Sequence, residues 1–233
     1  MSSLLALSLL LASAVSAPPI PRYPQLDEDK LTGVLVVVEV LEQEYLPTFA
    51  ACDQPDVVCM DPPPTWFRAR LLEQVHGEAL PTEFFAATTS HFGTTLRPEK
   101  GQPPSPVLMV LASDGKHLVM PRYSSAPVFR DSIGAFHLVV PDEDLPRWLP
   151  CGIASLVAPI NDDALAKSAA LSLADQPRYD DGWDAEFFRV DKTHAYPRFS
   201  IPVRHLSQWL AAGNASKDLR CNDQDEDEDE DDE

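Results

Sequence analysis

Proline is the feature that most restricts the fold of this chain. The 233 residues include 23 prolines, about one in ten, and only 9 glycines. Because proline lacks a backbone N–H and clashes with the preceding helical turn, this content argues against long uninterrupted helices. The 44% of hydrophobic residues is still enough for a core of domain size. The sequence therefore predicts short strands joined by rigid turns.

Seven short stretches predict strands. The first places four valines at alternate positions from Val34 to Val40, and the second alternates apolar residues with Arg68 and Arg70. The dipeptide Asp114-Gly115 between two apolar runs predicts a hairpin. The predicted strands are residues 31–41, 66–75, 83–89, 107–111, 117–120, 135–140 and 153–157.

The C-terminal third predicts helices and a tail. Asn161 is a good N-cap for a helix over 162–174, and a second helix over 203–212 has Pro202 at its start. Ten of the eleven residues from 223 to 233 are acidic, which predicts a disordered tail. Between the helices, aromatic side chains are expected to pack on the strands: Phe187, Phe188, Tyr196 and Phe199.

The N-terminus predicts export. Residues 4–15 form an apolar run that is too short to cross a bilayer but has the length of a signal-peptide core. We expect a signal peptide over 1–17, with cleavage after Ala14, Ser16 or Ala17, and a proline-rich lead over 18–30. No other stretch approaches the about 20 apolar residues of a membrane span. The expected location is periplasmic or extracellular.

The four cysteines predict two disulfides. Cys52, Cys59, Cys151 and Cys221 are an even number in a chain expected to enter an oxidising compartment. Three pairings are open, and the turn-rich residues 53–56 favour Cys52–Cys59, which leaves Cys151 for Cys221. A zinc site is the rival interpretation, but the chain has neither a C-x-x-C pair nor a matching histidine pair.

A family resemblance covers residues 31–140. A valine-rich first strand, a cysteine-bounded insertion and the strand sequence WFRARLLEQVHG at 66–77 resemble the secreted OB-like barrels of the netrin and tissue-inhibitor-of-metalloproteinase type. In the inhibitors an N-terminal cysteine presents its amino group to the protease metal, whereas the first cysteine here is Cys52. The resemblance therefore implies an OB-like barrel, a fold used mostly for binding, without implying protease inhibition.

Together these features predict a mainly β fold, α+β overall. We expect a small OB-like antiparallel barrel over 31–158, a helical and aromatic wrap packed on the barrel over 159–222, and the disordered acidic tail over 223–233.

Catalytic and metal-binding motifs are weak. Ser90 and His91 are adjacent, so a strand would point them to opposite faces, and no G-x-S-x-G motif supports a serine hydrolase. An acidic turn offers weak candidates for calcium ligands: Asp180, Asp181, Asp184 and Glu186. No catalytic residue and no cofactor is predicted. An enzyme of hydrolase type remains the alternative, with a site at a barrel mouth near His91, His117 or Asp114.

Charge narrows the class of partner. The formal net charge is −19, and the sequence has no basic patch, which argues against nucleic acid as a ligand. The acidic tail can hold divalent cations loosely or contact a basic partner. The sequence thus favours an exported binding or interaction module for a protein or another envelope component.

Overall fold

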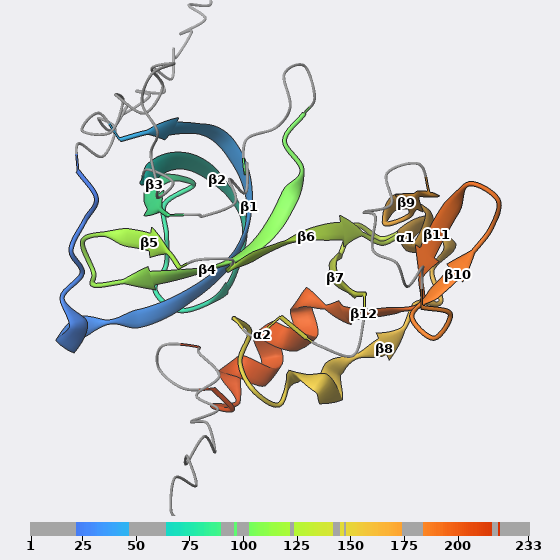
Figure 1. The fold of residues 1–233 in the computed structure, drawn as a ribbon. Helices are drawn as coiled ribbons and strands as arrows, with labels where there is room; N and C mark the ends of the chain where they lie inside the picture. Colours follow the sequence, from blue (N-terminus) through green and yellow to red (C-terminus); the bar gives the residue numbers. More distant parts are fainter. Residues whose placement is uncertain are drawn as a thin grey trace, which may run out of the picture.

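The computed structural model describes residues 22–46, 64–89, 96, 103–121, 124–141, 145–146, 148–173, 184–215 and 219. Within these ranges the chain is mainly β, and most elements are short (Figure 1). The first seven strands are β1 Thr32–Tyr45, β2 Thr65–His76, β3 Glu83–Thr88, β4 Pro106–Ser113, β5 Leu118–Met120, β6 Ser125–Arg130 and β7 Phe136–Val140. The remaining strands are β8 Ala158–Pro159, β9 Leu171–Ser172, β10 Phe188–Val190, β11 His194–Pro197 and β12 Phe199–Pro202. The helices are α1 Asp163–Ser168 and α2 Val203–Ala211, with the 3-10 turns η1 Glu28–Lys30 and η3 Ile153–Leu156.

Five strands close into a barrel. The order β1-β2-β3-β5-β4 returns to β1, because β4 pairs with β1 as well as with β5. Among these strands β3 and β5 are parallel, and the other neighbours are antiparallel. The ring confirms the small OB-like barrel expected from the sequence, although its fifth strand ends at Met120. The strands that follow build a second sheet.

Strand β1 is buried on both faces. Val34, Val36 and Val38 point into the barrel, where they pack with Phe67 and Met109. The intervening Leu35 and Val37 belong to a second core outside the barrel. Successive side chains of a strand point to opposite faces, so the continuous apolar run of β1 supplies both cores at once.

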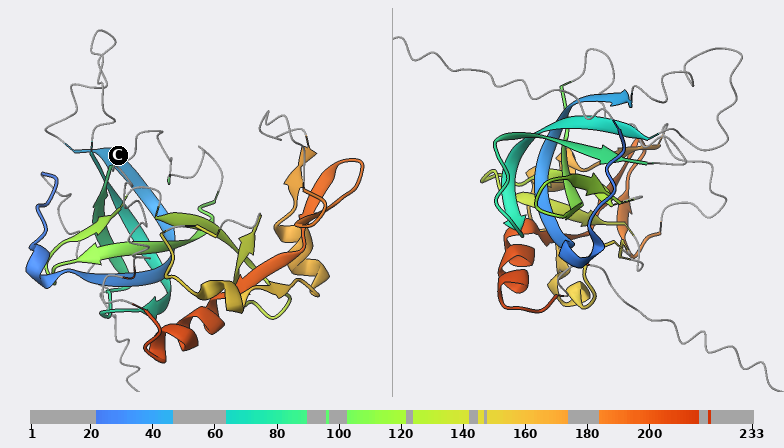
Figure 2. Two further views of the ribbon diagram at one scale, coloured as in Figure 1. Left: turned by 60° about the horizontal axis from the view of Figure 1, so that its bottom comes forward. Right: turned by 90° about the vertical axis from the view of Figure 1, so that its left-hand side faces the viewer.

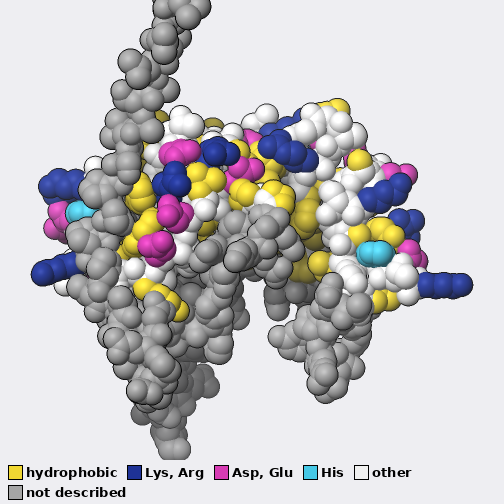
Figure 3. Space-filling view, turned by 90° about the horizontal axis from the view of Figure 1, so that it is seen from above, with side chains coloured by type: hydrophobic (Ala, Val, Ile, Leu, Met, Phe, Trp, Pro, Cys, Tyr) yellow, Lys and Arg dark blue, Asp and Glu magenta, His cyan; other side chains and the backbone are white. Residues whose placement is uncertain are grey.

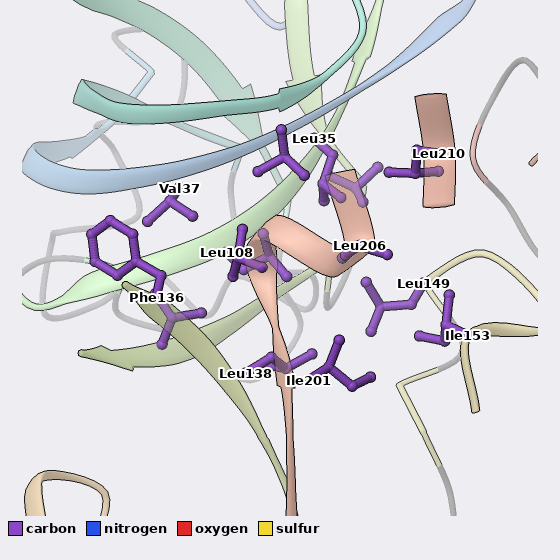
Figure 4. Packing of buried hydrophobic residues seen from close by; sticks show 14 of the residues in the cluster. Leu35, Val37, Leu108, Phe136, Leu138, Leu149, Ile153, Ile201, Leu206 and Leu210 are labelled. Carbon is purple, nitrogen blue, oxygen red and sulfur yellow. The ribbon is translucent and has the colours of Figure 1, made fainter. Parts of the chain in front are cut away.

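The second core lies between the barrel, a sheet extension and α2. Strand β6 pairs with β4 and then with β7, and β12 joins β7 to β8. Figure 4 shows Val37 of the barrel beside Phe136 of β7, with Leu108 between Val37 and Leu206 of α2. The Ser207 hydroxyl also donates to the Val75 carbonyl of β2, 2.9 Å away. The expected packing of a C-terminal helix on the barrel is therefore confirmed.

A small third sheet forms an arm. Strands β10, β11 and β9 pair in that order, and α1 packs beside β6 and β11. Figure 1 and the left view of Figure 2 place this sheet away from the barrel, on the far side of β6 and β7. The segment 159–222, expected to be helical and aromatic, thus also contains strands.

Two predicted elements were wrong in type or extent. The predicted strand over 153–157 is the 3-10 turn η3, which follows Gly152 in a left-handed conformation at φ +84°. The predicted helix over 162–174 ends at Ser168, because Leu171 pairs with Ala195 in the third sheet instead of continuing the helix. Its N-cap is Asp162, one residue after the expected Asn161.

Several predictions fall outside the described residues. These are the signal peptide, part of the proline-rich lead, the acidic tail and three of the cysteines, Cys52, Cys59 and Cys221. Cys151 is described, is exposed and is not a free thiol. Within the described ranges, no helix is long and apolar enough to cross a membrane.

Candidate functional site

The interior of the barrel is filled by its own side chains. Val36, Phe67, Met109 and Leu111 have no exposed surface there. The core also contacts Leu80 and Leu96, whose backbone N–H groups are held by Gln74 Oε1 at 3.3 Å and Gln43 Oε1 at 3.0 Å. A ligand would therefore have to bind the outer surface of this part of the barrel.

The outer face of β1, β2 and β3 carries a row of alternating charges. Because Phe67 and Ala69 point into the barrel, Arg68 and Arg70 point outward from β2. Their strand partners are acidic on β1, and on β3 Arg70 lies opposite a further acid. We call the set the ion-pair lattice; it consists of Glu39, Glu42, Arg68, Arg70 and Glu83.

The two arginines of the lattice share their three carboxylates. Arg68 bonds Glu42 through Nε at 3.1 Å and Glu83 through Nη1 at 3.0 Å. Arg70 lies 3.4 Å from Glu39 through Nη1 and 3.7 Å from the other oxygen of Glu83 through Nε. The central Glu83 therefore connects both arginines. The side chains range from 23% exposed at Glu39 to 48% at Arg70, so solvent reaches the whole set.

An aromatic pair borders the lattice. Phe85 of β3 lies opposite Arg68 and contacts Trp66 of β2, with ring centroids 5.5 Å apart and planes tilted by 54°. Trp66 is buried and Phe85 is half-buried. Figure 3 shows a surface of the molecule on which acidic and basic side chains alternate with hydrophobic ones. The β1–β3 face thus combines hydrogen-bond donors, acceptors and an apolar ring.

A second arrangement links three side chains typical of serine hydrolases. His137 of β7 lies 3.1 Å from Ser200 Oγ through Nδ1 and 3.2 Å from Asp131 Oδ2 through Nε2. The other oxygen of Asp131 accepts the N–H groups of Ile133 and Ala135, so Asp131 also shapes the turn between β6 and β7. Burial alone would raise the pKa of Asp131, but these hydrogen bonds and His137 hold it below its ordinary value.

The set Asp131, His137 and Ser200 is a structural connection between a turn and a strand. Ser200 is 2% exposed and lies in β12 between β7 and β8, which bind its strand from both sides. A nucleophilic hydroxyl has to meet a substrate carbonyl, and this hydroxyl is covered. His137 instead ties the turn between β6 and β7 to strand β12. No local sequence pattern connects these residues, because Ser200 lies 63 positions after His137.

Two residues suggested for an enzyme site at the barrel mouth, Asp114 and His117, form the hydrogen bonds of a turn. Asp114 Oδ1 accepts the backbone N–H groups of Lys116 at 2.9 Å and His117 at 2.8 Å, and Oδ2 lies 3.2 Å from His117 Nδ1. These hydrogen bonds hold the pKa of Asp114 far below its ordinary value. Asp114 is therefore the organising residue of the β4–β5 hairpin. Ser90 and His91 lie outside the described residues.

The predicted metal candidates are only partly described. Asp180 and Asp181 lie outside the described ranges. Asp184 Oδ1 accepts the backbone N–H of Glu186 at 2.7 Å, which is the contact of a turn. No group of three metal-ligating side chains occurs among the described residues.

Only part of the ion-pair lattice could be predicted from the sequence. The outward direction of Arg68 and Arg70 was readable from the alternation in β2, whereas their acidic partners depend on strand register. Comparison of the chain with protein families, curated proteins and solved structures found no match.

Proposed function

We propose that this protein is an exported, disulfide-stabilised binding module of the netrin-like barrel type, whose ligand binds the outer face of β1, β2 and β3. The observation that carries the proposal is the ion-pair lattice at the centre of that face. In OB barrels the face of strands 2 and 3 is the usual binding surface. The partner is a component of the cell envelope or its surroundings.

The energetics of the lattice favour a binding role. Exposed ion pairs contribute only about 0.2–1 kcal/mol each to stability, so five charged side chains on one face are weakly explained by stability alone. Shared contacts do restrict the rotamers of Arg68 and Arg70. Side chains that are ordered before binding lose less conformational entropy when a ligand arrives. The lattice is therefore a preorganised polar surface.

The test compares two charge-matched double variants of the mature protein. Arg68→Ala with Arg70→Ala removes the centre of the lattice, and Lys192→Ala with Arg204→Ala removes the same charge from exposed positions elsewhere. Each immobilised protein is exposed to a solubilised envelope fraction of the source cell, and the retained material is quantified.

The expected result is retention by the wild type and the control variant and loss by the lattice variant, with equal melting temperatures. Equal retention by all three proteins would exclude the β1–β3 face. An enzyme of hydrolase type is the alternative, and it would be favoured if turnover of envelope ester or amide substrates were detected with the wild type and lost on removal of His91.

A further inference from the structure

We infer that the ligand of the β1–β3 face is a neutral, polyhydroxylated chain, such as an oligosaccharide. The inference rests on the proposed function, since it names the chemistry of the ligand for that same face. It is carried by the way in which the lattice distributes charge, hydrogen-bonding groups and apolar surface.

Anionic ligands are disfavoured by the charge of the barrel. The described residues from 22 to 121 include ten Asp or Glu and five Lys or Arg, a net charge of −5. The described residues from 124 to 215 balance, with six of each sign. Among the described residues the excess of negative charge therefore lies in the barrel segment, and a phosphate or carboxylate ligand would be repelled on approach.

Cationic ligands gain little from the lattice. Both oxygens of Glu83 face an arginine, and one oxygen each of Glu39 and Glu42 does the same. A lysine or arginine of a partner would have to compete with Arg68 and Arg70 for these carboxylates. Three carboxylates with two guanidinium groups leave a local charge of only −1, so the lattice itself adds little attraction for a cation.

Neutral hydroxyl groups match the hydrogen-bond donors and acceptors that the four ion pairs of the lattice leave unused. Nη2 of Arg68 and Nη2 of Arg70 lie outside the four ion pairs, as do Oε1 of Glu39 and Oε1 of Glu42. Donors on the central strand therefore stand beside acceptors on its neighbour, whose backbone runs about 4.8 Å away across the sheet. A sugar hydroxyl donates and accepts at once, so it can bridge such a pair without displacing either ion.

The aromatic border supplies the remaining requirement of a sugar site. Phe85 lies opposite Arg68 and keeps part of its ring exposed. The apolar C–H face of a pyranose can pack on such a ring while its hydroxyls reach the charged groups. A ligand made of repeated sugar units would cover the lattice and the ring together.

The experiment measures binding of the full mature protein to three kinds of immobilised probe. The first is a panel of neutral oligosaccharides of at least four units built from glucose, mannose, galactose or N-acetylglucosamine. The second is an octalysine peptide, and the third is a twelve-residue oligothymidylate. The variants are Arg68→Ala with Arg70→Ala, Phe85→Leu, and the control Lys192→Ala with Arg204→Ala.

We expect saturable binding to at least one neutral oligosaccharide that changes less than about twofold between 0.05 and 0.5 M NaCl, because no net charge is neutralised. The lattice variant and Phe85→Leu should each weaken it by about tenfold or more, and the control should not. Binding of octalysine or oligothymidylate that exceeds binding to every sugar, and that the lattice variant abolishes, would overturn the inference while leaving the proposed function in place. If the lattice variant kept both envelope retention and probe binding, the proposed function itself would be overturned.

Discussion

Replacing His137 with leucine should destabilise the fold through a hydroxyl that it leaves behind. The imidazole Nδ1 lies 3.1 Å from the Ser200 hydroxyl, within hydrogen-bond distance, and Ser200 is only 2% exposed. Leucine has a similar size but cannot hydrogen-bond, so the hydroxyl would remain buried without its partner. A buried polar group left unsatisfied costs about 1–3 kcal/mol. We therefore expect His137→Leu to lower the free energy of unfolding by about 2 kcal/mol.

A double-mutant cycle isolates the interaction free energy between His137 and Ser200. Ser200→Ala removes the hydroxyl, so His137→Leu should cost about 1 kcal/mol less in that background than in the wild type. Urea unfolding of the oxidised protein, followed by tryptophan fluorescence, gives the four free energies. A coupling energy below about 0.3 kcal/mol would refute the reasoning, because it would mean that the two side chains act independently.

Three further predictions concern other parts of the fold. Gly77→Ala should destabilise the protein by more than about 1 kcal/mol, because an added Cβ would lie 2.6 Å from the Gly33 carbonyl oxygen at a φ of +87°; thermal unfolding measures the loss, and an unchanged Tm would contradict it. Hydrogen bonds from Ser132 and from the backbone N–H of Leu165 lower the pKa of Asp162 to about 2, so its stabilising contribution is complete above pH 4 and is lost as the pH falls toward 2; Asp162→Asn should flatten the dependence of Tm on pH in that window. The predicted Cys151–Cys221 disulfide closes a 71-residue ring and should contribute up to roughly 4.4 kcal/mol. Peptide mapping without reduction should recover that pair, and a Cys52–Cys151 peptide would contradict it.

The part of the fold that sequence predicts best is the part with strong local signals. The valine alternation of β1 and the Asp114-Gly115 turn each specify an element within a few residues. Strand β6 was missed because Pro127, which has no N–H to donate, lies within it opposite Val107. The short strands β8, β9 and β12 depend on pairing between distant segments, which no local pattern reveals.

The acidic members of the ion-pair lattice on β1 could not be predicted from alternation, because β1 contains a bulge. Glu39 and Glu42 are three positions apart, so simple alternation along β1 would place them on opposite faces. A register shift between Val40 and Glu42 brings both to the same face as Arg70 and Arg68. Periodicity therefore predicted the exposure of the two arginines but could not identify the carboxylates that bind them.

Burial of both faces of β1 has a consequence for how the chain reaches its folded state. The barrel strands end at Met120, whereas α2, whose Leu206 and Leu210 complete the second core around Leu35 and Val37, begins at Val203. During synthesis the barrel segment therefore emerges more than eighty residues before α2. Until α2 arrives, the second core remains incomplete and leaves apolar side chains exposed to solvent, the kind of surface through which incomplete chains aggregate. The barrel sequence comes first along the chain, but a chain interrupted before Val203 would remain prone to aggregation.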